Sequence, residues 1–273
     1  MSLSAVRCLS DAHHYSNWSN LTNLTELKIE VIDNFRLRPG QLPASLKKLE
    51  ISMEPIGYGW PIVEGILPDS LESFQLYNID GLLKPIRWPS SDNLTHVDLY
   101  INHFSDNLTQ HLFPRSLRSL RLHINIPSET RIDELLTPLT ALEEFELFCQ
   151  WEDPNDSLSL KSLSQSLTRL DLSRAEFNRP LLAGDLPASL RSLSLGGTGM
   201  RGLSKDYEDI IFHHPLTSES FLSCPDLEIL DIKNCTEYPH PIHYIILPKK
   251  LRLLCLAPGM AVLGEKSANL RIS

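Results

Sequence analysis

Leucines recur along the chain in a six-residue frame of the form LxxLxL. The clearest copy is residues 190–195, LRSLSL. In an extended strand, alternate side chains point to opposite faces, so Leu193 and Leu195 face one side while Ser192 and Ser194 face the other. The frame therefore predicts a short strand with one apolar face and one polar face.

The frame returns at a regular spacing along nearly the whole chain. Except for a step of 37 residues between Leu190 and Leu227, successive copies are 22 to 25 residues apart, within the period of about 20 to 29 residues of leucine-rich repeats. One copy buries too few leucines to offset the entropy of ordering its residues, so neighbouring copies must stack. We predict an α/β leucine-rich repeat solenoid, a right-handed horseshoe with a parallel β-sheet on its concave face. The copies begin at Leu24, Leu46, Leu71, Leu94, Leu117, Leu142, Leu167, Leu190, Leu227 and Leu251.

The segments between the predicted strands are rich in proline. The chain holds 19 prolines and 12 glycines, and proline favours extended backbone over helix. We therefore expect convex segments that are mostly extended or 3₁₀. Residues 128–136, SETRIDELL, are an exception that predicts a helix of two turns. A second short helix is expected around residues 203–212.

The repeats predict one domain over residues 1–273. Residues 1–23 form an N-terminal cap, residues 24–256 hold about ten repeats with an insertion near 199–222, and residues 257–273 form a C-terminal cap. The asparagine that usually closes the turn after each strand is mostly missing. We therefore expect the turns to be satisfied by other groups.

A second motif accompanies the leucine frame. Residues 177–181, FNRPL, are followed by residues 186–190, LPASL, and weaker copies end at Leu46, Leu71 and Leu251. The combination resembles the FNIP (Phe-Asn-Ile-Pro) subclass of leucine-rich repeats. The resemblance implies a protein-binding scaffold without catalytic residues.

Charge and cysteine content narrow the range of partners and compartments. A net charge of -9 disfavours nucleic acid and anionic membranes as partners, and no apolar run is long enough to span a bilayer. The five cysteines are scattered and odd in number, and the N-terminus lacks a secretory pattern, which favours a cytoplasmic protein with reduced thiols. We expect a monomer.

The predicted polar face of the sheet carries a run of aromatic residues. The seventh position of four successive repeats would form a ladder, flanked by charged residues at the fifth position, and exposed aromatics beside charges are typical of protein interfaces. The alternative is that the aromatics only stabilise neighbouring strands, and that Arg121 and Glu146 simply neutralise each other. The candidate protein-binding residues are Tyr77, Tyr100, His123, Phe148, Asp98, Arg121 and Glu146.

Two other apparent motifs do not indicate functional sites. Residues 197–202 spell GxGxxG, but no βαβ unit encloses them. His213, His214, Cys224 and Cys235 lack the paired spacing of structural zinc sites. We expect no metal, no cofactor and no catalytic residues.

Two functions from different classes remain open. The first is a non-catalytic scaffold that binds a partner protein on the concave face of the solenoid. The alternative is a substrate-recognition domain or subunit of an enzyme complex such as a ubiquitin ligase. A third option, a viral or parasite decoy that sequesters host proteins, has no sequence feature for or against it.

Overall fold

The computed structural model places two compact units along the chain, residues 1–125 and residues 126–273. The single domain predicted over the whole chain stays a prediction. The structure describes residues 2–8, 18–31, 37–53, 62–79, 86–101, 113–126, 132–151, 158–197, 212–236, 238–266 and 268–273.

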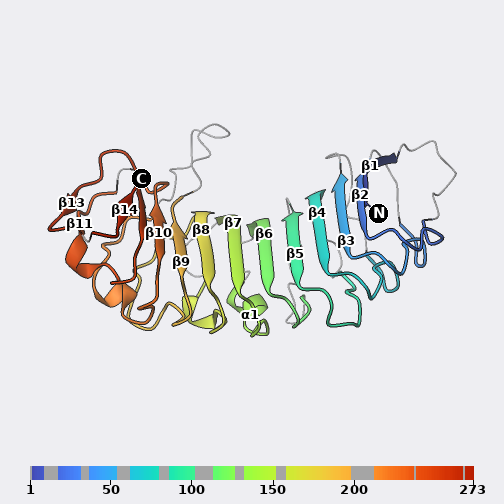
Figure 1. Cartoon of the computed structure of the whole chain (residues 1–273), viewed down its shortest axis with the longest axis horizontal. Helices are drawn as coiled ribbons and strands as arrows, with labels where there is room; N and C mark the ends of the chain where they lie inside the picture. Colours follow the sequence, from blue (N-terminus) through green and yellow to red (C-terminus); the bar gives the residue numbers. More distant parts are fainter. Residues whose placement is uncertain are drawn as a thin grey trace. The chain divides into compact units, whose positions relative to one another are not determined.

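The first unit is a parallel sheet whose strands follow one another in chain order (Figure 1). From β2 onward, each strand begins two residues after the first leucine of its frame, as the pattern predicts. Residues 3–8, LSAVRC, match the frame only loosely and also lie in a strand. This strand pairs with β2 through Leu3 and Leu27. The strands are β1 (Ser2–Cys8), β2 (Glu26–Val31), β3 (Lys48–Met53), β4 (Ser73–Ile79), β5 (His96–Ile101) and β6 (Ser119–Ile126).

The second unit continues the same plan, with parallel strands in the order β7, β8, β9, β10, β12 and β14. The last of these, within the predicted C-terminal cap, pairs with β12 at the edge of the sheet. A separate two-stranded pair, β11 with β13, was not predicted. The strands are β7 (Glu144–Trp151), β8 (Arg169–Ala175), β9 (Ser192–Leu195), β10 (Ile229–Ile232), β11 (Ile242–His243), β12 (Leu253–Leu256), β13 (Val262–Leu263) and β14 (Arg271–Ile272).

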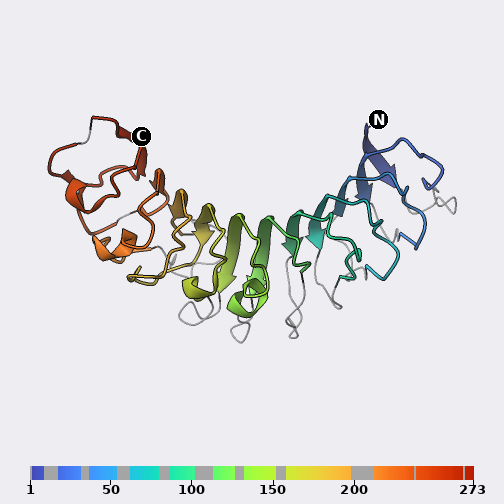
Figure 2. The ribbon, with the colours of Figure 1, turned by 60° about the horizontal axis from the view of Figure 1, so that its bottom comes forward.

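The connecting segments lie on the other side of each coil from the strands (Figure 2). They contain α1 (Ile132–Leu136) and three 3₁₀ turns, η1 (Leu160–Ser162), η2 (Glu219–Phe221) and η3 (Tyr244–Ile246). The predicted helix is therefore present over its final turn, and its first residues lie outside the described part. The predicted helix around 203–212 also lies outside it, except for Phe212, which is not helical.

The leucine frame forms the core of both units. The first leucine of every frame from Leu24 to Leu251 is at most 4% exposed. The fourth and sixth frame positions are also buried in most strands, as with Leu193 and Leu195 in β9. In the described part of the chain, no helix is both long enough and apolar enough to cross a membrane.

Serine hydroxyls satisfy backbone carbonyls just before the strands in four of the repeats. The serine that precedes the frame leucine donates a hydrogen bond of 2.7 Å to the carbonyl oxygen of the preceding frame leucine: Ser45 to Leu24, Ser70 to Leu46, Ser116 to Leu94 and Ser189 to Leu167. These bonds satisfy a carbonyl at the start of each strand and tie each repeat to the one before it. The backbone turn that presents the serine is closed by the proline carbonyl of the LPxSL motif, which accepts from the leucine amide, as in Leu71 to Pro68 at 3.1 Å.

Candidate functional site

In each unit, the solvent-facing side of the strands forms a mostly polar face. It consists of the third, fifth and seventh positions of each frame, while the fourth and sixth positions are buried. In β5, Val97, Leu99 and Ile101 point into the core and His96 is exposed. Asp98 is an exception, because it lies on the polar face and is nevertheless only 9% exposed.

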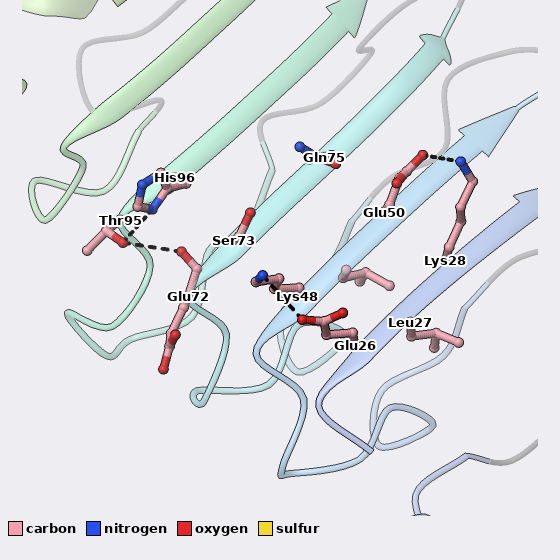
Figure 3. A pocket seen from close by; sticks show the side chains of 11 residues that line it. Glu26, Leu27, Lys28, Lys48, Glu50, Glu72, Ser73, Gln75, Thr95 and His96 are labelled. Carbon is pink, nitrogen blue, oxygen red and sulfur yellow. Dashed lines mark hydrogen bonds and ion pairs between the residues drawn. The ribbon is translucent and has the colours of Figure 1, made fainter. Parts of the chain in front are cut away.

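The N-terminal part of the polar face is a depression of about 660 Å³ over β2 to β5. Its charged side chains pair across neighbouring strands (Figure 3). Lys28 Nζ lies 2.6 Å from Glu50 Oε1, and Lys48 Nζ lies 3.2 Å from Glu26 Oε1. The hydrogen bond and the charge of Glu50 raise the pKa of the Lys28 ammonium. Because these partners neutralise each other at the surface, they contribute little net stability or net charge.

The polar face over β4 to β6 brings together five of the predicted site residues. We call Tyr77, Asp98, Tyr100, Arg121 and His123 the central cluster. Tyr77 Oη donates a hydrogen bond of 3.0 Å to Asp98 Oδ2, and the rings of Tyr100 and His123 are 5.3 Å apart. Asp98 and Tyr100 lie opposite Arg121 and His123 in the register of β5 and β6. The cluster is thus a set of cross-strand neighbours on three consecutive strands.

Tyr77 is displaced from the position that a strict repeat would give it. The register of β4 and β5 pairs Leu76 with Leu99 and then Ile79 with Ile101. Two residues of β4, Tyr77 and its successor, therefore lie opposite Tyr100 alone, which is a β-bulge. The Tyr77 hydroxyl instead bonds diagonally to Asp98. Burial, with the charge of Asp98 as the next cause, raises the pKa of the Tyr77 phenol, which keeps it a hydrogen-bond donor.

The other two predicted site residues belong to the second unit. Glu146 lies opposite Asp171, and Phe148 lies opposite Arg174 after a shift in the register of β7 and β8. Both are partly exposed on the polar face of that unit. An aromatic ladder that joins all four repeats stays a prediction.

A row of buried aromatic rings lies between repeats in the second unit. Phe177 and Phe212 stack with ring centroids 6.4 Å apart, and Phe212 and Tyr238 stack at 6.2 Å. Each ring precedes a proline by three residues, namely Pro180, Pro215 and Pro241. The row therefore repeats the aromatic position of the motif at residues 177–181.

The asparagine of that motif binds a segment within the long step between Leu190 and Leu227. Asn178 Nδ2 donates to His213 Nδ1 at 3.0 Å, and the His213 amide donates to Asn178 Oδ1 at 3.3 Å. His214 Nε2 donates to the Asn178 carbonyl oxygen at 3.2 Å. The motif therefore positions the next repeat through both its ring and its amide.

A family model described as FNIP Repeat matches residues 154–198, which include the Phe177 and Asn178 of these contacts. The chain is a leucine-rich repeat solenoid that contains an FNIP repeat. The predicted fold and the predicted resemblance are both confirmed. No curated protein sequence matches the chain.

Two solved structures share the leucine-rich repeat architecture. An internalin, InlF from Listeria monocytogenes, is 14% identical with a TM-score of 0.55, over 94% of this chain and 76% of the internalin chain. CroV588, described as a novel circular LRR protein, is 18% identical with a TM-score of 0.49, over 92% of this chain. This chain spans only 42% of the length of CroV588.

The sequence patterns did not lead us to predict that Phe212 and Tyr238 occupy the aromatic position of the FNIP motif. The signal was present, because F-x-x-P and Y-x-x-P repeat the spacing of residues 177–180. The long step between Leu190 and Leu227 hid it. Tyr238 is also tied by its hydroxyl, which donates to the His214 carbonyl at 2.8 Å and accepts from the Leu216 amide at 3.0 Å.

Three of the four cysteines in the second unit are buried parts of its core. Cys149, Cys224 and Cys235 are fully buried and free. Burial raises the pKa of Cys224 to about 11 and that of Cys235 to about 12, so both remain thiols at neutral pH and are poor nucleophiles. Among the described residues, no group of three or more His, Cys, Asp or Glu is arranged to hold a metal ion.

Proposed function

We propose that this FNIP-containing solenoid is a non-catalytic scaffold that binds a partner protein through its polar face, the side of the sheet predicted to be concave. Leucine-rich repeat solenoids commonly mediate protein interactions, and their regular sheet supplies a broad surface for a folded partner. The central cluster is the proposed centre of the interface, and Glu146 and Phe148 are the proposed binding residues of the second unit.

The observation that carries the proposal is the state of the aromatic side chains. Tyr77, Tyr100 and His123 are partly exposed on the polar face of the sheet. Their rings are held by the Asp98 bond and by the contact between Tyr100 and His123. Rigid aromatics lose little entropy when a partner covers them, which is why they dominate interface energetics.

Quantitative affinity capture from the source cell tests the proposal. The wild-type chain is compared with a Tyr77→Ala/Tyr100→Ala variant and with Tyr244→Ala, a matched control at a partly exposed tyrosine outside the polar face. We expect the captured partner to be lost with the double variant and retained with Tyr244→Ala, with all three chains folded by circular dichroism. Retention of the partner by a folded double variant would overturn the proposal.

A further inference from the structure

Three aspartates occupy the fifth position of the frame, and two of them accept a hydrogen bond from the backbone amide two residues later. Asp171 Oδ1 accepts a hydrogen bond of 3.0 Å from the Ser173 amide, and Asp231 Oδ1 accepts one of 3.0 Å from the Lys233 amide. Asp231 also forms an ion pair of 2.9 Å with the Lys233 ammonium. These two carboxylates therefore act as local caps of the strand backbone.

Asp98 occupies the same position and is different. Its Oδ2 accepts from Tyr77, but its Oδ1 is buried and has no hydrogen-bond partner among the described residues. The reason lies in the strand register: Tyr100 and Ile101 remain paired with His123 and Ile124. The backbone beyond Asp98 therefore stays in the sheet ladder and does not turn back to the carboxylate.

An unsatisfied carboxylate oxygen in a buried position costs free energy, because water no longer solvates it and no donor replaces the water. A donor that reaches this oxygen would recover that cost on binding. A cationic donor would gain most, because hydrogen bonds between charged groups are about twice as strong as neutral ones.

The neighbours of Asp98 suit a flat or compact cation. Tyr77 bonds to the carboxylate, and Tyr100 lies two residues along the same strand on the same face. Aromatic ring faces attract guanidinium and ammonium groups. Gln75 and Arg121 lie opposite Asp98 on β4 and β6, and Arg121 is exposed.

We propose that the partner protein presents a basic side chain, an arginine or a lysine, to Asp98 beside Tyr77 and Tyr100. This inference rests on the proposed function and adds the chemistry of the partner. The net charge of -9 favours the same class of partner, because it attracts a basic segment over longer distances.

The inference is tested with peptides selected by the full chain. A phage library of random peptides is selected on the immobilised wild-type protein, and the affinities of the enriched peptides are then measured by calorimetry for wild type and variants. We expect enriched peptides to contain arginine or lysine and to lose binding to Tyr77→Ala/Tyr100→Ala. Asp98→Asn should weaken them at least about tenfold.

Two controls separate charge recognition from loss of structure. Asp171→Asn removes a carboxylate at the same frame position and should leave peptide affinity unchanged. Replacement of the peptide arginine by citrulline, a neutral analogue, should weaken binding to the wild-type chain by a similar factor as Asp98→Asn, without any change in the protein.

The outcomes distinguish the two proposals. Peptides that require the tyrosines but carry no basic residue, or that bind Asp98→Asn as well as wild type, would overturn the basic-partner inference and leave the proposed function standing. If no enriched peptide depends on the tyrosines, the polar face is not the binding surface, and both proposals fail.

Discussion

The Ser70 hydroxyl donates a hydrogen bond of 2.7 Å to the Leu46 carbonyl oxygen, which lies 24 residues earlier in the chain. The bond joins the turn of one repeat to the first frame leucine of the preceding one. Leu46 is fully buried, so its carbonyl depends on this donor.

Ser70→Ala should lower the free energy of unfolding by about 1 to 3 kcal/mol, because a buried acceptor loses its partner. Urea-induced unfolding followed by circular dichroism measures the change. Ser192→Ala is the control, since its partly exposed hydroxyl has no hydrogen-bond partner in the described regions. Equal stabilities of the two variants would show that the serine bonds do not stabilise the solenoid.

Gly196→Ala should destabilise the second unit. A Cβ at this position would lie 2.5 Å from the Ser173 carbonyl oxygen and 2.6 Å from Asn234 Cβ. Asn234 crosses over Gly196 and donates from Nδ2 to that same carbonyl at 3.3 Å. We expect a loss of about 2 to 4 kcal/mol from overpacking and from the disturbed hydrogen bond.

A double-mutant cycle checks the cause of that loss. If the methyl group displaces Asn234, then Asn234→Ala should cost less in the Gly196→Ala background than in the wild-type chain. Thermal unfolding measures all four proteins. Strict additivity would contradict the contact between these two positions.

Tyr238→Phe should lower the free energy of unfolding by about 1 to 3 kcal/mol, although the stacked ring remains. The change leaves the Leu216 amide without its acceptor and the His214 carbonyl without its donor. Tyr244→Phe is the matched control at a partly exposed ring. Chemical denaturation distinguishes them, and a neutral Tyr238→Phe would show that the hydroxyl does not anchor the FNIP aromatic row.

His214 should make the free energy of unfolding decrease as the pH falls. Burial lowers the pKa of His214 below its ordinary 6.5, and the charges of His213 and His240 act in the same direction, while the bond to Asn178 opposes them. The folded chain therefore favours the neutral imidazole. The stability that this preference contributes is present above pH 6.5 and is lost as the pH falls through the lowered value.

Unfolding curves between about pH 7 and pH 5 test this dependence. The free energy of unfolding should fall less steeply for His214→Gln than for the wild-type chain, since glutamine keeps a donor for the Asn178 carbonyl. His243→Gln, at an exposed histidine, should follow the wild-type slope. Parallel curves for all three proteins would exclude His214 as the source.

The leucine frame predicted the strands with little error, because a period of two and a regular repeat length together determine which side chains are buried. Every strand from β2 to β10 begins where its frame places it, and so does β12. The serine bonds were not predicted. The missing asparagines concern the turn after each strand, whereas the serines bond carbonyls that precede the strands.

The central cluster was predicted only in outline. The pattern identified the residues of the polar face, but the bulge at Tyr77 depends on the register between two strands, which a repeat alone does not determine. The unsatisfied Oδ1 of Asp98 could not be predicted from the sequence either. Asp98, Asp171 and Asp231 share one frame position, and only the course of the neighbouring backbone distinguishes them.

The hydrogen bond from each turn serine ends on a main-chain oxygen, an atom that every amino acid supplies. When recombination places a serine-bearing repeat after a different repeat, the serine therefore still has a backbone carbonyl oxygen as its acceptor. The sequence of the preceding repeat does not have to change. The number of such repeats can therefore increase or decrease during evolution while the hydrogen bond between neighbouring repeats is kept.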